Sequence, residues 1–168
     1  TFTTWSGSAE GERIRILPTG GITFNGDTAA ANALDDYEEG AWTPVLAGAG
    51  GQAGQSYTTQ EGTYTKVGRQ VTATFYIILP TKGTITGNLL IAGLPVASMA
   101  GSRSAISTSY VKNLTLTSPQ SLVGTVDPSL SYIDLWTAAY NGATSARVTT
   151  TAVANGFVIV GSVTYFTA

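Results

Sequence analysis

The chain has 168 residues, of which 43% are hydrophobic and only 11% are charged, with a net charge of −2. It contains no cysteine and no histidine, which excludes disulfides, thiol chemistry and Ser-His-Asp catalysis. The small net charge gives no general attraction to nucleic acid or acidic membranes, and no apolar run approaches the roughly 20 residues that span a bilayer. A charge content this low suits a β-rich, extracellular protein.

Two short runs of alternating apolar residues flank the turn sequence at 18–21. Ile14 and Ile16 fall on one side of the first run, and Ile22 and Phe24 fall on one side of the second. Alternation with a period of two predicts strands with one buried face. Because a lone hairpin of this size is marginally stable in water, we predict a trimerising stem in which three copies cover one another's apolar residues.

The segments before and after this hairpin receive simpler interpretations. Residues 1–11 are polar, with Phe2 and Trp5 as isolated anchors, and we expect them to be the frayed end of an upstream part. Residues 27–34 are rich in alanine and begin with Asp27. Alanine has the highest helix propensity and aspartate is a good N-cap, so this segment is predicted to form a short helix that packs against the stem or against sister chains.

An acidic joint then links the stem to the rest of the chain and contains Asp35, Asp36, Glu38 and Glu39. Carboxylates can bind a cation, but these lack the spacing of a calcium loop, and we interpret them as a solvated joint. No metal or cofactor is predicted. Acidic residues dominate before this point and basic residues after it, which places a trimerising stem and linker at residues 1–40 and a head at residues 41–168.

The head is predicted to consist of many short strands. It starts with an extended segment at 41–46 in which Trp42 is buried, since the residue before a proline favours extended geometry. Residues 62–67 and 70–79 flank Gly68-Arg69, which fits a hairpin with a type II′ turn. The strand at 70–79 should turn one face to the core, with Val71, Ala73, Phe75, Ile77 and Leu79.

Further strands are predicted at 88–92, 104–111, 114–117, 120–126, 132–138, 146–151 and 156–166. Short strands separated by Gly, Ser and Asn turns indicate antiparallel sheets. The expected fold is therefore all-β and homotrimeric: a short intertwined β stem followed by an antiparallel, jelly-roll-like β-sandwich head.

Residues 131–142 are the most informative stretch of the head for binding. In a strand, Ile133 and Leu135 face inward. The opposite face then carries Tyr132, Asp134 and Trp136. Aromatic rings stack on sugars and a carboxylate accepts their hydroxyl hydrogen bonds, so this face is typical of glycan binding. It is also typical of packing against a neighbouring subunit or a second sheet. Tyr140 and Asn141, in the following turn, can extend either surface.

Four other residues of the head can meet acidic sugars or lipopolysaccharide phosphates: Arg103, Tyr110, Lys112 and Arg147. Scattered basic residues on a surface are usually only solvated, which is the interpretation we prefer here. Catalysis has little support, because glycoside hydrolysis needs paired carboxylates and the head offers only Glu61, Asp127 and Asp134. We predict no enzymatic activity.

Three stretches, at 13–26, 34–44 and 62–71, resemble the C-terminal end of bacteriophage tail fibres and tailspike-type proteins. Together they cover under half of the chain, and the second and third in this order are typical of phage and prophage structural proteins. The resemblance implies a homotrimer joined to the upstream part of the same fibre, an extracellular location on the virion, and a receptor-binding tip. It transfers no catalytic residue.

Three hypotheses follow. The leading one is a trimeric fibre tip that binds a bacterial surface glycan, such as lipopolysaccharide, or an outer-membrane receptor, without inserting into the membrane. The second is a purely structural domain that trimerises and caps the fibre. The third is a polysaccharide depolymerase or esterase end.

Overall fold

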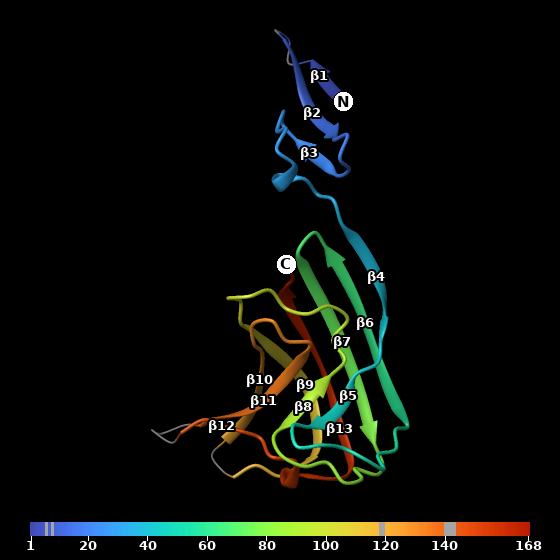
Figure 1. The fold of residues 1–168 in the computed structure, drawn as a ribbon, viewed down its shortest axis with the longest axis vertical. Helices are drawn as coiled ribbons and strands as arrows, with labels where there is room; N and C mark the ends of the chain where they lie inside the picture. The colour runs from blue at the N-terminus through green and yellow to red at the C-terminus, as the bar shows by residue number, and fades with distance from the viewer. Residues whose placement is uncertain (6, 8, 118–119, 140–143) are drawn as a thin grey trace.

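The structure, a computed structural model, describes residues 1–5, 7, 9–117, 120–139 and 144–168. Within these ranges the chain is all-β, with strands and two 3-10 turns. A small sheet of the N-terminal strands lies beyond one end of an elongated head, and strand β4 leads from one to the other (Figure 1). The described residues contain no helix long and apolar enough to cross a membrane.

The N-terminal sheet has the order β1-β2-β3, formed by Phe2–Trp5, Glu10–Ile16 and Ile22–Phe24. Its register pairs Ile14 with Phe24 and Ile16 with Ile22, so the predicted hairpin is confirmed. The expectation of a frayed end at residues 1–11 is wrong, because β1 pairs along β2. We call this sheet, with the segment up to Leu34, the stem.

The alanine-rich segment forms one 3-10 turn at Ala30–Asn32 and not the predicted helix. The carboxylate of Asp27 accepts hydrogen bonds from the Ala29 amide at 2.8 Å and from Asn32 Nδ2 at 2.6 Å, and these bonds lower the pKa of Asp27. Leu34 then pairs with Ile22 as a β-bridge. Since the chain must be extended again by Leu34, no room remains for the turns that a helix needs.

The described residues of the head form ten strands: β4 Tyr37–Trp42, β5 Val45–Gly48, β6 Thr59–Val67, β7 Gln70–Leu79, β8 Leu89–Ala92, β9 Ser104–Leu114, β10 Gln120–Val126, β11 Tyr132–Ala139, β12 Ala146–Arg147 and β13 Val153–Phe166. They form one antiparallel path, β4-β6-β7-β13-β9-β10-β11-β8-β5, with β12 beside β11. A second 3-10 turn, Thr150–Ala152, precedes β13.

Strand β9 connects the two parts of this path. It pairs with β13 along most of its length, and Ser104 and Ala105 at its start pair with β10. We call β4-β6-β7-β13-β9 the first half-sheet and β9-β10-β11-β8-β5 the second half-sheet. The sheet curls so that the inner faces of both halves enclose one core. The antiparallel all-β head is thereby confirmed, whereas the sandwich, the jelly roll and the homotrimer stay predictions.

The hairpin of β6 and β7 is confirmed in detail. Val67 pairs with Gln70 across a two-residue loop, and Gly68 has a φ of +55°, as the first position of a type II′ turn requires. All five residues predicted to form the core face of β7 are buried. Trp42 is also buried, and its indole N–H donates to the carbonyl of Thr74 at 2.9 Å.

Candidate functional site

The aromatic stripe predicted on residues 132–136 lies on β11, on the outer face of the second half-sheet. Ile133 and Leu135 are fully buried in the core, so alternation places the stripe on the opposite face. Asp134 does not offer a free carboxylate there, because it is only 4% exposed and Arg147 Nη2 donates to its Oδ2 at 3.0 Å.

Arg147 reaches this position because β12 pairs with β11, with Arg147 opposite Trp136. Its guanidinium lies 5.0 Å from the centre of the Trp136 ring, within the range of a cation–π contact. The indole Nε1 of Trp136 is buried and has no hydrogen-bond partner. A buried N–H without a partner is costly.

Arg147 also borders a hollow of 270 Å³, which Tyr132, Asp134 and Trp136 do not line. The hollow is lined by polar side chains and backbone from several segments, among them Thr117, Gln120, Thr137 and Thr149. Arg147 keeps 42% of its side chain exposed. The stripe and Arg147 together therefore offer aromatic rings and one accessible cation, which is a set suited to a sugar that carries an acidic group.

The other predicted binding residues are not brought together with this stripe by any described contact. Arg103 pairs with Asp127 at 2.7 Å. Tyr110 and Lys112 lie on β9, in the part that pairs with β13 of the first half-sheet, and both are exposed. Tyr140 and Asn141 lie outside the described residues.

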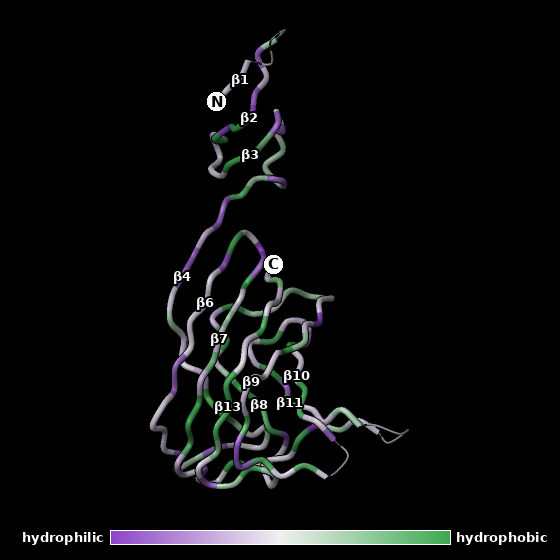
Figure 2. The backbone as a smooth tube through the Cα atoms, turned by 180° about the vertical axis from the view of Figure 1, so that it is seen from behind, coloured by the Kyte–Doolittle hydropathy of each residue, from purple (hydrophilic) through white to green (hydrophobic). Residues whose placement is uncertain are grey.

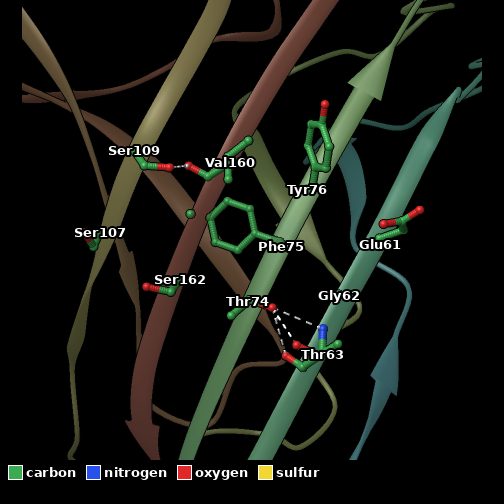
Figure 3. Close-up of a pocket in the computed structure, with 11 residues that line it drawn as sticks. Glu61, Gly62, Thr63, Thr74, Phe75, Tyr76, Ser107, Ser109, Val160 and Ser162 are labelled. Atoms are coloured by element: carbon green, nitrogen blue, oxygen red, sulfur yellow. Dashed lines mark hydrogen bonds between the residues drawn. The ribbon is translucent and has the colours of Figure 1, made fainter.

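A groove that the sequence did not indicate lies on the outer face of the first half-sheet (Figure 3). It has a volume of 390 Å³ and crosses β6, β7, β13 and β9. Its side chains are mostly hydroxyl-bearing, with Thr63, Thr74, Ser107, Ser109 and Ser162, and they are joined by Glu61, Tyr76 and Val160. Sequence reasoning missed it because these residues come from four strands far apart in the chain. The available signal was the alternation of Thr72, Thr74 and Tyr76 opposite the core face of β7.

The residues predicted to trimerise the stem share one face of its sheet. Residues paired across antiparallel strands lie on the same face. The register gives two rows there, Phe2–Ile14–Phe24 and Ile16–Ile22–Leu34. We call these six residues the stem strip. Ile16 is 66% exposed and Phe24 is 52% exposed, and Figure 2 shows hydrophobic residues in β3 although it lies beyond the head.

The opposite face of the stem is covered by the chain itself around β3. Thr23 and Leu17, which alternate with the strip residues, are both buried. A Cβ atom placed on Gly21 would lie 2.9 Å from the Cβ of Ala33, so the segment after the 3-10 turn packs against this side. Around β3 the stem strip is therefore the face that a single copy leaves uncovered, and Trp5 on β1 is also 68% exposed.

The acidic joint takes part in the edge of the head sheet. Lys66 is ion-paired with Asp36, and its Nζ lies 3.6 Å from Glu38. Tyr37 donates to Glu39 at 2.9 Å, and this bond raises the pKa of Tyr37. Among the described residues no group of three or more His, Cys, Asp or Glu side chains is placed to hold a metal ion.

No protein-family model and no curated protein matches the chain. Among solved structures, the crystal structure of the Dettilon tailspike protein (gp208) is similar, with a TM-score of 0.63 and 17% sequence identity. The chain shares the fold of part of a phage tailspike. The match covers 77% of this chain and 24% of the tailspike chain, so the chain spans about a quarter of that protein. At this identity the likeness concerns the fold.

Proposed function

We propose that this chain is part of a bacteriophage tail fibre or tailspike, exposed on the virion, that assembles as a homotrimer and binds a glycan on the surface of the host bacterium. The observation that carries the proposal is the fold, which matches part of a tailspike over 77% of the chain. Two surfaces support it: the stem strip supports assembly, and the stripe on β11 supports glycan binding.

The glycan surface is built by Tyr132, Trp136 and Arg147. Asp134, which we first considered as an acceptor for sugar hydroxyls, instead holds Arg147 in place through their hydrogen bond of 3.0 Å. The partly exposed guanidinium beside the indole ring favours sugars with a carboxylate or phosphate, because charge-assisted hydrogen bonds are the stronger ones. Lipopolysaccharide carries such groups.

The chain acts in this proposal by binding and not by catalysis. Residues 41–168 contain three carboxylate side chains, and two of them are paired with arginine, Asp127 with Arg103 and Asp134 with Arg147. Glu61 lies apart from both, on the groove of the first half-sheet. A depolymerase would need two carboxylates facing one glycosidic bond.

Binding of the purified protein to whole host cells and to a glycan array tests the proposal. Trp136→Ala should lower cell binding at least tenfold while solution mass and urea unfolding stay close to those of the parent. Trp5→Ala is the matched control, because Trp5 is an exposed tryptophan on β1 of the stem, and it should leave binding unchanged. Equal binding by parent and Trp136→Ala would reject the β11 surface as the glycan site.

A purely structural role is the second candidate. It is favoured by one observation, the amount of apolar surface that a single copy leaves exposed on the stem. If the protein is a trimer that binds neither cells nor any glycan, and Trp136→Ala lowers its mass, the structural role is the correct one.

A further inference from the structure

The outer face of the first half-sheet is organised in rows by its register, because paired residues share a face. The row nearest the stem is Tyr37–Val67–Gln70–Phe166. Two rows in the middle are Glu39–Thr65–Thr72–Thr164 and Thr63–Thr74–Ser162–Ser107. The next row is Glu61–Tyr76–Val160–Tyr110. We call these four rows the outer face.

This face collects the exposed apolar residues of the head. Six large hydrophobic side chains are exposed among the described residues from Tyr37 onward, and five of them lie in the first and last rows of the outer face: Tyr37, Val67, Tyr76, Tyr110 and Phe166. The sixth, Val123, lies on β10 of the second half-sheet. Exposed apolar groups gathered on one face mark an interaction surface.

The middle rows carry hydroxyl groups that already bond to one another. Thr63 and Thr74 are joined at 2.8 Å between their Oγ1 atoms, and Thr72 and Thr164 at 3.1 Å. Buried polar groups cost little when they are hydrogen-bonded within the protein. Hydroxyls paired in this way lose less when a protein partner covers them than unpaired hydroxyls would.

The surface is also continuous with the stem strip. Leu34 closes the second row of the strip by pairing with Ile22. Its Cδ1 lies 4.0 Å from the position of a Cβ on Gly68, in the turn that follows Val67. The exposed apolar residues therefore run from the stem to the first row of the outer face, and copies that meet through their stems bring their heads close together.

We propose that the outer face is the surface through which the heads of neighbouring copies pack, so that assembly uses the head as well as the stem. The occupant is a second copy of this chain. The charged residues within the four rows are Glu39 and Glu61, which both lie on the β4–β6 side of the face, so the parts on β7, β13 and β9 meet without charge repulsion. The groove of 390 Å³ receives side chains of the neighbouring copy. This inference rests on the proposed homotrimer.

The test compares Tyr76→Lys with Val123→Lys in the full chain. Tyr76 and Val123 are both 38% exposed and both lie on strands, so the two variants compare lysines of equal exposure on the two half-sheets. Mass is measured by light scattering over a range of concentrations, and folding by urea unfolding. Tyr110→Lys, at a more exposed position of the same row, serves as the second variant.

Val123→Lys should assemble like the parent. For Tyr76→Lys and Tyr110→Lys, the protein concentration at which half of the assembly dissociates should be at least tenfold higher than for the parent. If both lysine variants of the outer face are folded and assemble like the parent, this inference is overturned while the trimer stands. A monomeric parent would instead overturn the proposed homotrimer itself. If the variants lose glycan binding with their mass unchanged, the outer face is a glycan site and the inference is also wrong.

Discussion

Arg147 Nη2 lies 3.0 Å from Asp134 Oδ2, and the carboxylate that it neutralises is almost fully buried. The pair joins β12 to β11 and fixes the guanidinium beside the Trp136 ring. It therefore has two consequences, one for the stability of the head and one for the glycan surface.

Arg147→Met should lower the free energy of unfolding by about 1–3 kcal/mol, because it leaves a buried carboxylate without its charged partner. Urea unfolding at neutral pH measures the change. Asp134→Asn combined with Arg147→Met should recover part of the loss, since the buried charge is then gone. Arg103→Met is the comparison: its partner Asp127 keeps 15% of its side chain exposed, against 5% for Asp134, so the loss should be smaller than for Arg147→Met. Equal losses in the two single variants would contradict this.

Gly62→Ala should destabilise the head by about 1–3 kcal/mol, which is the usual cost of overpacking. A Cβ atom at this position would lie 2.4 Å from the indole Nε1 of Trp42, and that ring is held by its bond to the Thr74 carbonyl. Gly11→Ala is the control, because its Cβ would meet only the end of the exposed Arg13 side chain at 3.5 Å. Thermal and urea unfolding should separate the two variants. A neutral Gly62→Ala would show that Trp42 is free to move.

The chain should lose stability in alkali because of the buried hydroxyl group of Tyr165. Burial raises the pKa of Tyr165 to about 12 from an ordinary value of 10.0, so the unfolded chain releases this proton first. The stabilisation is complete below pH 10 and is lost as the pH rises towards 12. Between pH 10 and pH 12, the free energy of unfolding should fall less steeply with pH for Tyr165→Phe than for the parent.

The same variant has a second effect at lower pH. The hydroxyl of Tyr165 donates to the Val96 carbonyl at 2.8 Å, and its removal should cost about 1 kcal/mol at pH values where tyrosine is neutral. Parallel pH profiles for parent and Tyr165→Phe would contradict the assigned pKa.

Ile16→Lys should weaken assembly without unfolding the single copy. Ile16 is 66% exposed in one chain, so the lysine is solvated there, but it would be buried without a counter-charge between copies. The concentration at which half of the protein dissociates should rise at least tenfold, as measured by sedimentation velocity. Thr19→Lys, in the exposed turn of the same hairpin, should leave that concentration unchanged.

Local alternation predicted the parts of this fold that depend on neighbours in sequence. The hairpin around Gly68 and the hairpin of Ile14 to Phe24 were both predicted with their faces, because period-two patterning and turn glycines act over a few residues. The helix predicted at 27–34 is absent because a contact with a residue distant in sequence decides the conformation of this segment. The β-bridge from Leu34 to Ile22 overrides the propensity of the alanines.

Long-range pairing decided the rest. Nothing near Asp134 in the sequence shows that Arg147 neutralises it, since the contact depends on β12 folding back beside β11. The groove and the outer face likewise depend on β13 lying between β7 and β9. The sequence therefore predicted residues of the candidate site, but not the charges and contacts that determine what it binds.

Light scattering of the purified chain tests the central claim most directly, because both the stem strip and the outer face need other copies to cover them. The account predicts a mass three times the 17.3 kDa of one chain, held at concentrations well below those used for binding. A stable particle with the mass of one chain, with the apolar residues of stem and head still exposed, would contradict it.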